Sequence, residues 1–202
     1  MASSYVNNLR LEEIGTGEAS GSWGTKTNTN LELIGEALGY GTRAIANAST
    51  DNITIADGST DADRAMYLKL TGGGQACTIT LLPNTSSKVW MMQNDTSYTL
   101  TFSQGSGANV TLAAGKVKII ATDGGGSGAI VYDVLNTLVL DGVTMTGTTV
   151  YSALNDGTTT LTSTVAELNI LDGVTSTAAE LNYLDITTLG TSHVSKAVTV
   201  DS

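Results

Sequence analysis

Eight short apolar runs, spaced roughly ten residues apart, constrain the fold of this chain more than any other feature of its sequence. Glycine, asparagine and aspartate lie between the runs, and these residue types favour turns. Threonine alternates with apolar residues in several runs, which is typical of a sheet with one face in water. The pattern predicts a mainly β domain at residues 43–136, an antiparallel β-sandwich or jelly-roll-like fold. The runs are residues 53–56, 66–70, 77–82, 89–92, 100–102, 110–112, 117–121 and 130–135.

Residues 1–42 precede this domain and contain one predicted short helix, at residues 30–38. Gly39 follows the helix as a natural C-cap. Trp23 lies upstream among several glycines, so we expect an extended arm that carries one docked tryptophan. The apolar residues of the helix fall at helical spacing, and they are Leu31, Leu33, Ile34, Ala37 and Leu38.

Residues 137–202 are rich in threonine and contain one 13-residue unit twice, in Thr164-Val-Ala-Glu-Leu-Asn-Ile-Leu-Asp172 and Thr177-Ala-Ala-Glu-Leu-Asn-Tyr-Leu-Asp185. Each copy opens with a Thr-x-x-Glu capping box, which predicts two short helices. Helices this short are unstable alone, and no core lies near them in the sequence. We therefore expect their apolar side chains to be buried between copies of the chain, and an alternative is that they fold back on the β domain. These side chains belong to Leu168, Ile170, Leu171, Leu181, Tyr183 and Leu184.

Charge and composition exclude several classes of function. Nine Lys and Arg stand against 19 Asp and Glu, a net charge of −10, whereas nucleic-acid binding needs clustered basic residues. No run of 18 apolar residues occurs, so membrane insertion is not expected. Cys77 and His193 are each the only residue of their type, so a catalytic triad or dyad would depend on a single histidine in a polar stretch.

The remaining motifs do not favour an enzyme or a cofactor site. The glycine runs at 72–74 and 124–128 lack the Lys-Ser or Lys-Thr of a phosphate-binding loop. Paired carboxylates such as Asp61 and Asp63 have no aromatic platform near them in the sequence. The segment 57–63 spaces its carboxylates as a calcium loop does, but it lacks the bidentate glutamate at the twelfth position. We expect no catalysis, no cofactor and no metal.

Three segments carry a resemblance to a known family. Residues 17–37, GEASGSWGTKTNTNLELIGEA, resemble the N-terminal segment of tail fibre and related structural proteins of marine bacteriophages. The Ala-Glu-Leu-Asn-x-Leu-Asp repeat and residues 189–202, LGTSHVSKAVTVDS, are similar to stalk segments of the same proteins. The β domain takes no part in this resemblance.

The resemblance implies a non-enzymatic virion protein, made in the host cytoplasm and located in the phage tail. Such fibres are homotrimers whose N-terminal part docks onto tail proteins such as an adaptor or nozzle. This implies an attachment arm at 1–42 and a trimeric stalk that begins within 137–202. Family sequences continue beyond such an end, so the region that recognises a host surface receptor is expected outside residues 1–202. The expected docking residues are Trp23, Leu31, Leu33, Ile34 and Leu38.

Two other functions remain open from the sequence. A decoration or head fibre protein of the capsid would dock through the same kind of arm. A carbohydrate-binding module would place its site on the β domain.

Overall fold

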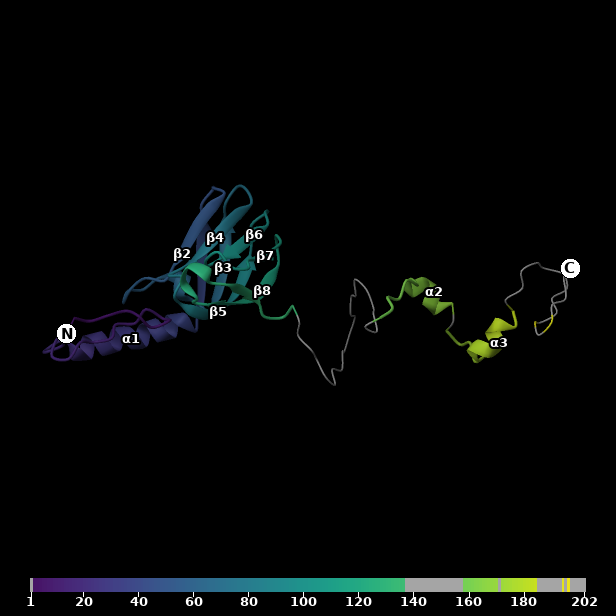
Figure 1. Ribbon diagram of the computed structural model, residues 1–202, viewed down its shortest axis with the longest axis horizontal. Helices are drawn as coiled ribbons and strands as arrows, with labels where there is room; N and C mark the ends of the chain where they lie inside the picture. Colours follow the sequence, from purple (N-terminus) through teal and green to yellow (C-terminus); the bar gives the residue numbers. More distant parts are fainter. Residues whose placement is uncertain (1, 137–157, 171, 185–193, 195, 197–202) are drawn as a thin grey trace. The chain divides into compact units, whose positions relative to one another are not determined.

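The computed structural model describes residues 2–136, 158–170, 172–184, 194 and 196 (Figure 1). The chain divides into two compact units, Met1–Asp141 and Gly142–Ser202. The first unit is mainly β, as predicted, and contains helix α1 (Trp23–Ala37) and nine strands. The boundary expected at residue 42 falls inside the first strand, and the N-terminal residues belong to the same compact unit as the strands.

The strands form two mixed sheets. Sheet A has five strands in the order β1-β3-β5-β8-β9, and sheet B has four in the order β2-β4-β6-β7. Two short 3-10 helices interrupt the connections, η1 (Ala62–Arg64) and η2 (Gly126–Gly128). The strands are β1 (Tyr40–Ile45), β2 (Thr50–Thr54), β3 (Tyr67–Gly72), β4 (Cys77–Leu82), β5 (Ser87–Asn94), β6 (Leu100–Ser103), β7 (Val110–Leu112), β8 (Val117–Asp123) and β9 (Val131–Asp133).

The expected antiparallel order is wrong for the first six strands. The six strands alternate between the sheets, and β1, β2, β3 and β4 each pair in parallel with the strand two positions later. A parallel pair needs a long crossover, which is usually a helix. Here the crossover is a strand of the opposite sheet, so the chain winds through three turns: β1 with β2, β3 with β4, and β5 with β6. Among the nine strands, antiparallel pairing occurs between β5 and β8, β6 and β7, and β8 and β9.

One buried core lies between the two sheets. Alternate residues of each strand point into it, including Leu68, Trp90 and Ile120 from sheet A and Ile79 and Phe102 from sheet B. Apolar burial on this scale is the main favourable term in folding. The eight predicted runs correspond to β2 through β9, whereas β1 was not predicted.

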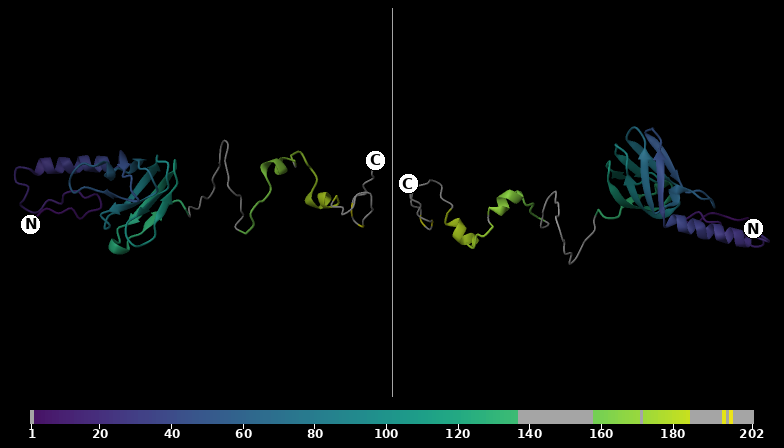
Figure 2. Two further views of the ribbon diagram at one scale, coloured as in Figure 1. Left: turned by 90° about the horizontal axis from the view of Figure 1, so that it is seen from above. Right: turned by 180° about the vertical axis from the view of Figure 1, so that it is seen from behind.

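Helix α1 is longer than predicted. It begins at Trp23 instead of residue 30, with Ser22 as the N-cap residue, and ends at Ala37. Trp23 therefore belongs to the helix and not to an extended arm. Figures 1 and 2 show that the C-terminal end of α1 adjoins the β domain and that the helix projects away from the strands, with the N-terminal segment running along it.

The second unit contains two described helices, α2 (Val165–Asn169) and α3 (Ala178–Asn182), of five residues each. Both predicted capping boxes are formed. The Thr164 hydroxyl accepts a hydrogen bond from the Glu167 amide, and the Glu167 carboxylate accepts one from the Thr164 amide at 2.7 Å. Thr177 and Glu180 repeat the arrangement.

Candidate docking site

The N-terminal segment forms a hairpin that lies against α1. Ser4 and Glu13 pair through two backbone hydrogen bonds of 3.1 and 2.8 Å, and we call residues 4–13 the N-terminal hairpin. The Asn7 side chain closes the turn, donating to the Leu11 carbonyl at 2.8 Å and accepting from the Leu11 amide at 2.9 Å. The first residues of the chain thus have a defined structure instead of forming a loose arm.

Two side chains of α1 hold the hairpin along the helix. Asn30 accepts a hydrogen bond from the Glu12 amide at 3.0 Å and donates to the Glu12 carbonyl at 2.9 Å. Lys26 forms an ion pair with the Glu12 carboxylate, one turn earlier. The hydrogen bond from Lys26 to the Glu12 carboxylate lowers the pKa of Glu12 and raises the pKa of Lys26. Both groups are therefore charged at neutral pH.

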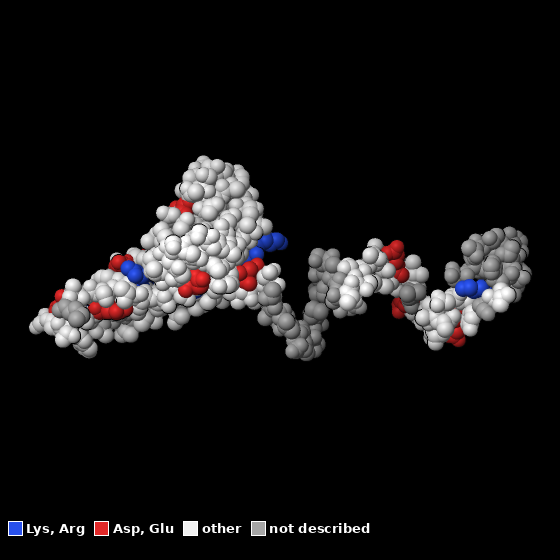
Figure 3. Space-filling view, viewed as in Figure 1, with Lys and Arg blue, Asp and Glu red and all other residues white. Residues whose placement is uncertain are grey.

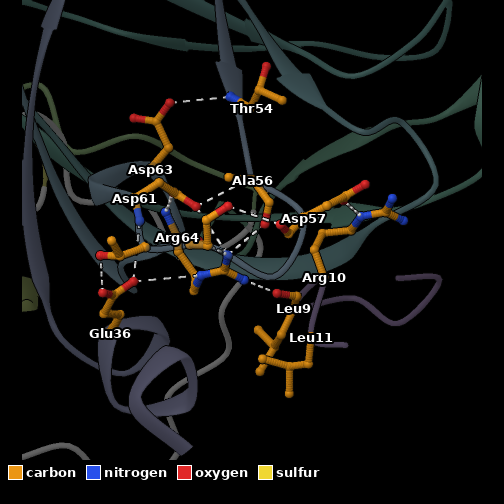
Figure 4. Close-up of polar contacts among 12 residues, drawn as sticks. Leu9, Arg10, Leu11, Glu36, Thr54, Ala56, Asp57, Asp61, Asp63 and Arg64 are labelled. Atoms are coloured by element: carbon orange, nitrogen blue, oxygen red, sulfur yellow. Dashed lines mark hydrogen bonds and ion pairs between the residues drawn. The ribbon is translucent and has the colours of Figure 1, made fainter. Parts of the chain in front are cut away.

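A buried arginine, Arg64 of η1, joins the hairpin, α1 and the β domain (Figure 4). Its side chain is fully buried, and its guanidinium donates to the carbonyls of Leu9, Ala56 and Ser59. It lies 3.2 Å from the carboxylate of Asp61. Burial of a guanidinium is costly unless it is paired in this way. These contacts therefore hold the hairpin, at Leu9, against the β domain, at residues 56–61.

The third connection runs from the same arginine to α1. Nε of Arg64 makes no hydrogen bond, but it lies 3.8 Å from Glu36 of the helix. The Glu36 carboxylate also accepts hydrogen bonds from the Thr60 hydroxyl and from the Asp61 amide, the latter at 3.3 Å. The C-terminal half of α1 is thereby attached to the loop that precedes η1. Sequence reasoning missed Arg64, because a lone arginine in Ala-Asp-Arg-Ala carries no motif.

All three carboxylates of residues 57–63 form ion pairs with arginines. Asp57 pairs with Arg10 at 2.6 Å, Asp61 with Arg64, and Asp63 with Arg43. Burial raises the pKa of Asp63, although the charge of Arg43 opposes the shift. Within the described part of the chain, no group of three or more potential metal-ligating side chains occurs. The loop 57–63 therefore helps to attach the N-terminal hairpin and α1 to the β domain.

The polar contacts of Lys26, Asn30 and Glu36 hold one face of α1. Another face of the helix is apolar and remains exposed. Trp23, Leu31, Ile34 and Leu38 recur at intervals of three, four or eight residues, which places them on one side of the helix. Trp23 is 66% exposed and borders a hollow of about 420 Å³ that is also lined by residues 14–17, 19 and 20. We call these four residues the α1 stripe. Leu33, expected to dock with them, is only 1% exposed and faces the interior, so it is excluded from the stripe.

The side chains expected at a subunit interface in the second unit are partly described. Leu168, Ile170, Tyr183 and Leu184 are exposed, and Leu181 is half-buried. Leu171 lies outside the described residues. Within the second unit taken by itself, these short helices therefore leave most of their described large apolar side chains exposed.

Comparison with known proteins does not assign the chain to a family. No protein-family model matches it, and no curated protein or solved structure is significantly similar to it. In the part of the chain that the structure describes, no helix has the length and apolar character needed to cross a membrane.

Proposed function

We propose that the chain is a structural virion protein, the proximal part of a homotrimeric bacteriophage tail fibre. In this proposal the N-terminal hairpin and α1 attach the fibre to tail proteins such as an adaptor or nozzle. Residues 137–202 begin the stalk, which leads to a distal region that recognises the host surface. The sandwich-like domain, whose two sheets share one core, connects the attachment segment to the stalk.

The exposed α1 stripe is the observation that supports attachment best. Exposed apolar patches on a protein surface mark interaction sites when they are contiguous. A tryptophan is also a frequent anchor of protein–protein interfaces, because it buries a large area with few rotatable bonds. The stripe lies on a helix that Asn30, Lys26 and Glu36 fix in place, so docking would not require the helix to become ordered. The resemblance of residues 17–37 to fibre N-termini covers the same helix.

The experiment is to replace Trp23 by alanine in a phage that carries this gene and to image the purified particles with an antibody against the chain. Because Trp23 is exposed and supports no core contact, we expect the variant to fold and to be made in normal amounts. The particles should lose most of their labelled fibres. Tyr98→Ala, which removes an exposed aromatic side chain far from α1 in sequence, is the matched control and should leave the labelling unchanged. Full labelling of the Trp23→Ala particles contradicts the docking role.

The same images separate tail attachment from a capsid location. Label at the tail supports the fibre proposal, and label over the head identifies a capsid decoration or head fibre protein. Label on neither, together with binding of the purified chain to a glycan array, replaces the proposal with a carbohydrate-binding function.

A further inference from the structure

The two outward faces of the β domain differ in chemistry. In sheet B the outward residues are almost all hydroxyl or amide side chains, and four threonines form one row across the sheet, Thr50, Thr78, Thr101 and Thr111. In sheet A the corresponding row is Tyr40, Tyr67, Met91 and Ile119. Both sheets cover the same core, so burial within the domain does not explain the difference.

The apolar character extends over most of the outward face of sheet A. A second row across it consists of Val89, Ala121 and Tyr132. Tyr40 and Tyr67 stack with ring centroids 5.6 Å apart. The large apolar side chains on this face and directly after β9 are between 43% and 63% exposed: Tyr40, Val89, Val117, Tyr132, Val134 and Leu135.

This area is large enough for a stable protein–protein interface. With about 200 Å² for a whole tyrosine, the exposed parts of Tyr40 and Tyr132 amount to roughly 200 Å². The four aliphatic side chains, each about half exposed, add a similar area, so the total is on the order of 400 Å². A standard interface takes about 800 Å² from each partner, of which a little over half, roughly 450 Å², is apolar. The exposed face of sheet A matches that apolar share.

Charge favours a second copy of this chain as the partner. Copies with a net charge of −10 repel one another, and they approach most easily through an uncharged surface. The charged side chains on the outward face of sheet A include Asp123 and Lys69, which is paired with Asp95 at 2.8 Å. Lys118 and Asp133, which lie beside this face, pair with each other at 2.9 Å. Broad areas of the β domain in Figure 3 carry no charge, and acidic residues dominate where charge occurs.

The face also contains a recess that an apolar side chain could fill. A hollow of about 420 Å³ lies where β5, β8 and the end of β9 meet. Its lining combines the apolar side chains of Met91, Val117, Ile119 and Leu135 with Asn136 and the ion pair of Lys118 and Asp133. We infer that the outward face of sheet A is the surface through which copies of this chain associate. This deepens the proposed function, which includes self-association, and it places the contact on the β domain in addition to the stalk helices.

The test uses the full chain at micromolar concentration, with mass measured by sedimentation equilibrium. We expect the wild type to sediment as a multiple of its 20.7 kDa mass. Val89→Glu combined with Val117→Glu places charges within the apolar contact and should weaken association at least tenfold. Thr78→Glu combined with Thr101→Glu puts the same charges on sheet B and should change nothing. Circular dichroism and thermal unfolding check that each variant is folded.

Several results would overturn the inference. One is a monomeric wild type at roughly 100 μM, a concentration at which an interface of standard size associates. Another is association of the sheet A variant as strong as that of the wild type. A third is loss of association only in Leu168→Glu with Leu181→Glu, which would place the contact in the second unit. If the glutamate variant fails to fold, Val89→Ala with Val117→Ala removes apolar area without adding charge and must still weaken association at least threefold. Because these measurements do not involve a virion, they can fail while tail attachment holds, and the reverse is equally true.

Discussion

Replacement of Arg64 by methionine is the most direct test of how the N-terminal hairpin and α1 are attached to the β domain. Methionine is unbranched and about as long as the aliphatic part of arginine, but it donates no hydrogen bond. The carbonyls of Leu9, Ala56 and Ser59 then lose their donor, and the carboxylates of Asp61 and Glu36 lose their cation. Arg64 is fully buried, so water does not readily replace these contacts.

The expected loss is large compared with the stability of a domain. Each buried acceptor left without a donor costs about 1–3 kcal/mol, but the removal of a buried charge also relieves its desolvation cost. Removal of one partner of a buried pair typically costs about 3–5 kcal/mol, and we expect Arg64→Met to fall in this range. A loss of about 4 kcal/mol raises the equilibrium constant for unfolding roughly a thousandfold. The total free energy of unfolding of a domain is about 5–15 kcal/mol, so the variant should be only marginally folded at 37 °C.

The assay is urea unfolding followed by the fluorescence of Trp90, which is buried in the core, in a Trp23→Phe background. Arg10→Met is the matched control, because Arg10 pairs with Asp57, whose side chain is about half exposed. An exposed pair contributes about 1 kcal/mol or less, so the control should lose little stability. Hydrogen exchange should locate the damage in the hairpin amides of Ser4 and Glu13, which exchange sooner once Leu9 is released. If Arg64→Met and Arg10→Met lose the same free energy of unfolding, the buried contacts of Arg64 have no special role.

Two further predictions concern the pKa of Lys88 and the packing of glycines. Burial, and next the charge of Arg64, lower the pKa of Lys88 to about 8 from 10.5, so the folded state releases this proton before the unfolded state does. Stability from this group therefore rises as pH increases from 8 to 10.5, and the wild type should gain about 2 kcal/mol relative to Lys88→Met between pH 7.5 and 10 in urea titrations. A constant difference across that range refutes the shift. A Cβ at Gly41 would lie 2.4 Å from the Ala62 carbonyl oxygen, whereas one at Gly35 of α1 would meet nothing within 4 Å. We expect Gly41→Ala to cost about 1–3 kcal/mol and Gly35→Ala to stabilise by up to about 1 kcal/mol; the same sign for both in urea unfolding would contradict this packing.

The sequence predicted the local features of the fold well and the pairing of its strands poorly. Each apolar run became a strand, and both capping boxes formed, because these features depend on residues within four positions of each other. The partner of a strand is not encoded in this way. A turn such as Asp57-Gly58 fits a hairpin within one sheet as well as a crossing to the other, and here it belongs to a crossing. β1 was missed because Gly41 and Arg43 interrupt its apolar pattern; Gly41 is required by the close approach of η1.

The extent of α1 shows the same limit. Its first eight residues, Trp-Gly-Thr-Lys-Thr-Asn-Thr-Asn, include glycine, threonine and asparagine, which are poor helix formers, so the sequence favours a later start. The helix is held by tertiary contacts that no local pattern reveals, namely those of Lys26 and Asn30 to Glu12. The same contacts turn Leu33 inward and leave the α1 stripe outward. The sequence thus predicted which apolar residues the helix carries, but not the side of the helix on which each lies.

These attachments also bear on how well α1 can dock. A helix that pivots freely would lose conformational entropy on binding, and part of the gain from burying Trp23 and Leu31 would be offset. Contacts from Lys26 and Asn30 at one point and from Glu36 at another hold α1 along more than two turns, so the stripe is presented in one orientation before any partner arrives. Loosening the helix without changing the stripe should therefore weaken docking. Asn30→Ala leaves every residue of the stripe in place, and we expect it to reduce fibre labelling on particles in the same direction as Trp23→Ala but by less; labelling equal to that of the wild type would show that a preformed orientation of α1 is not needed.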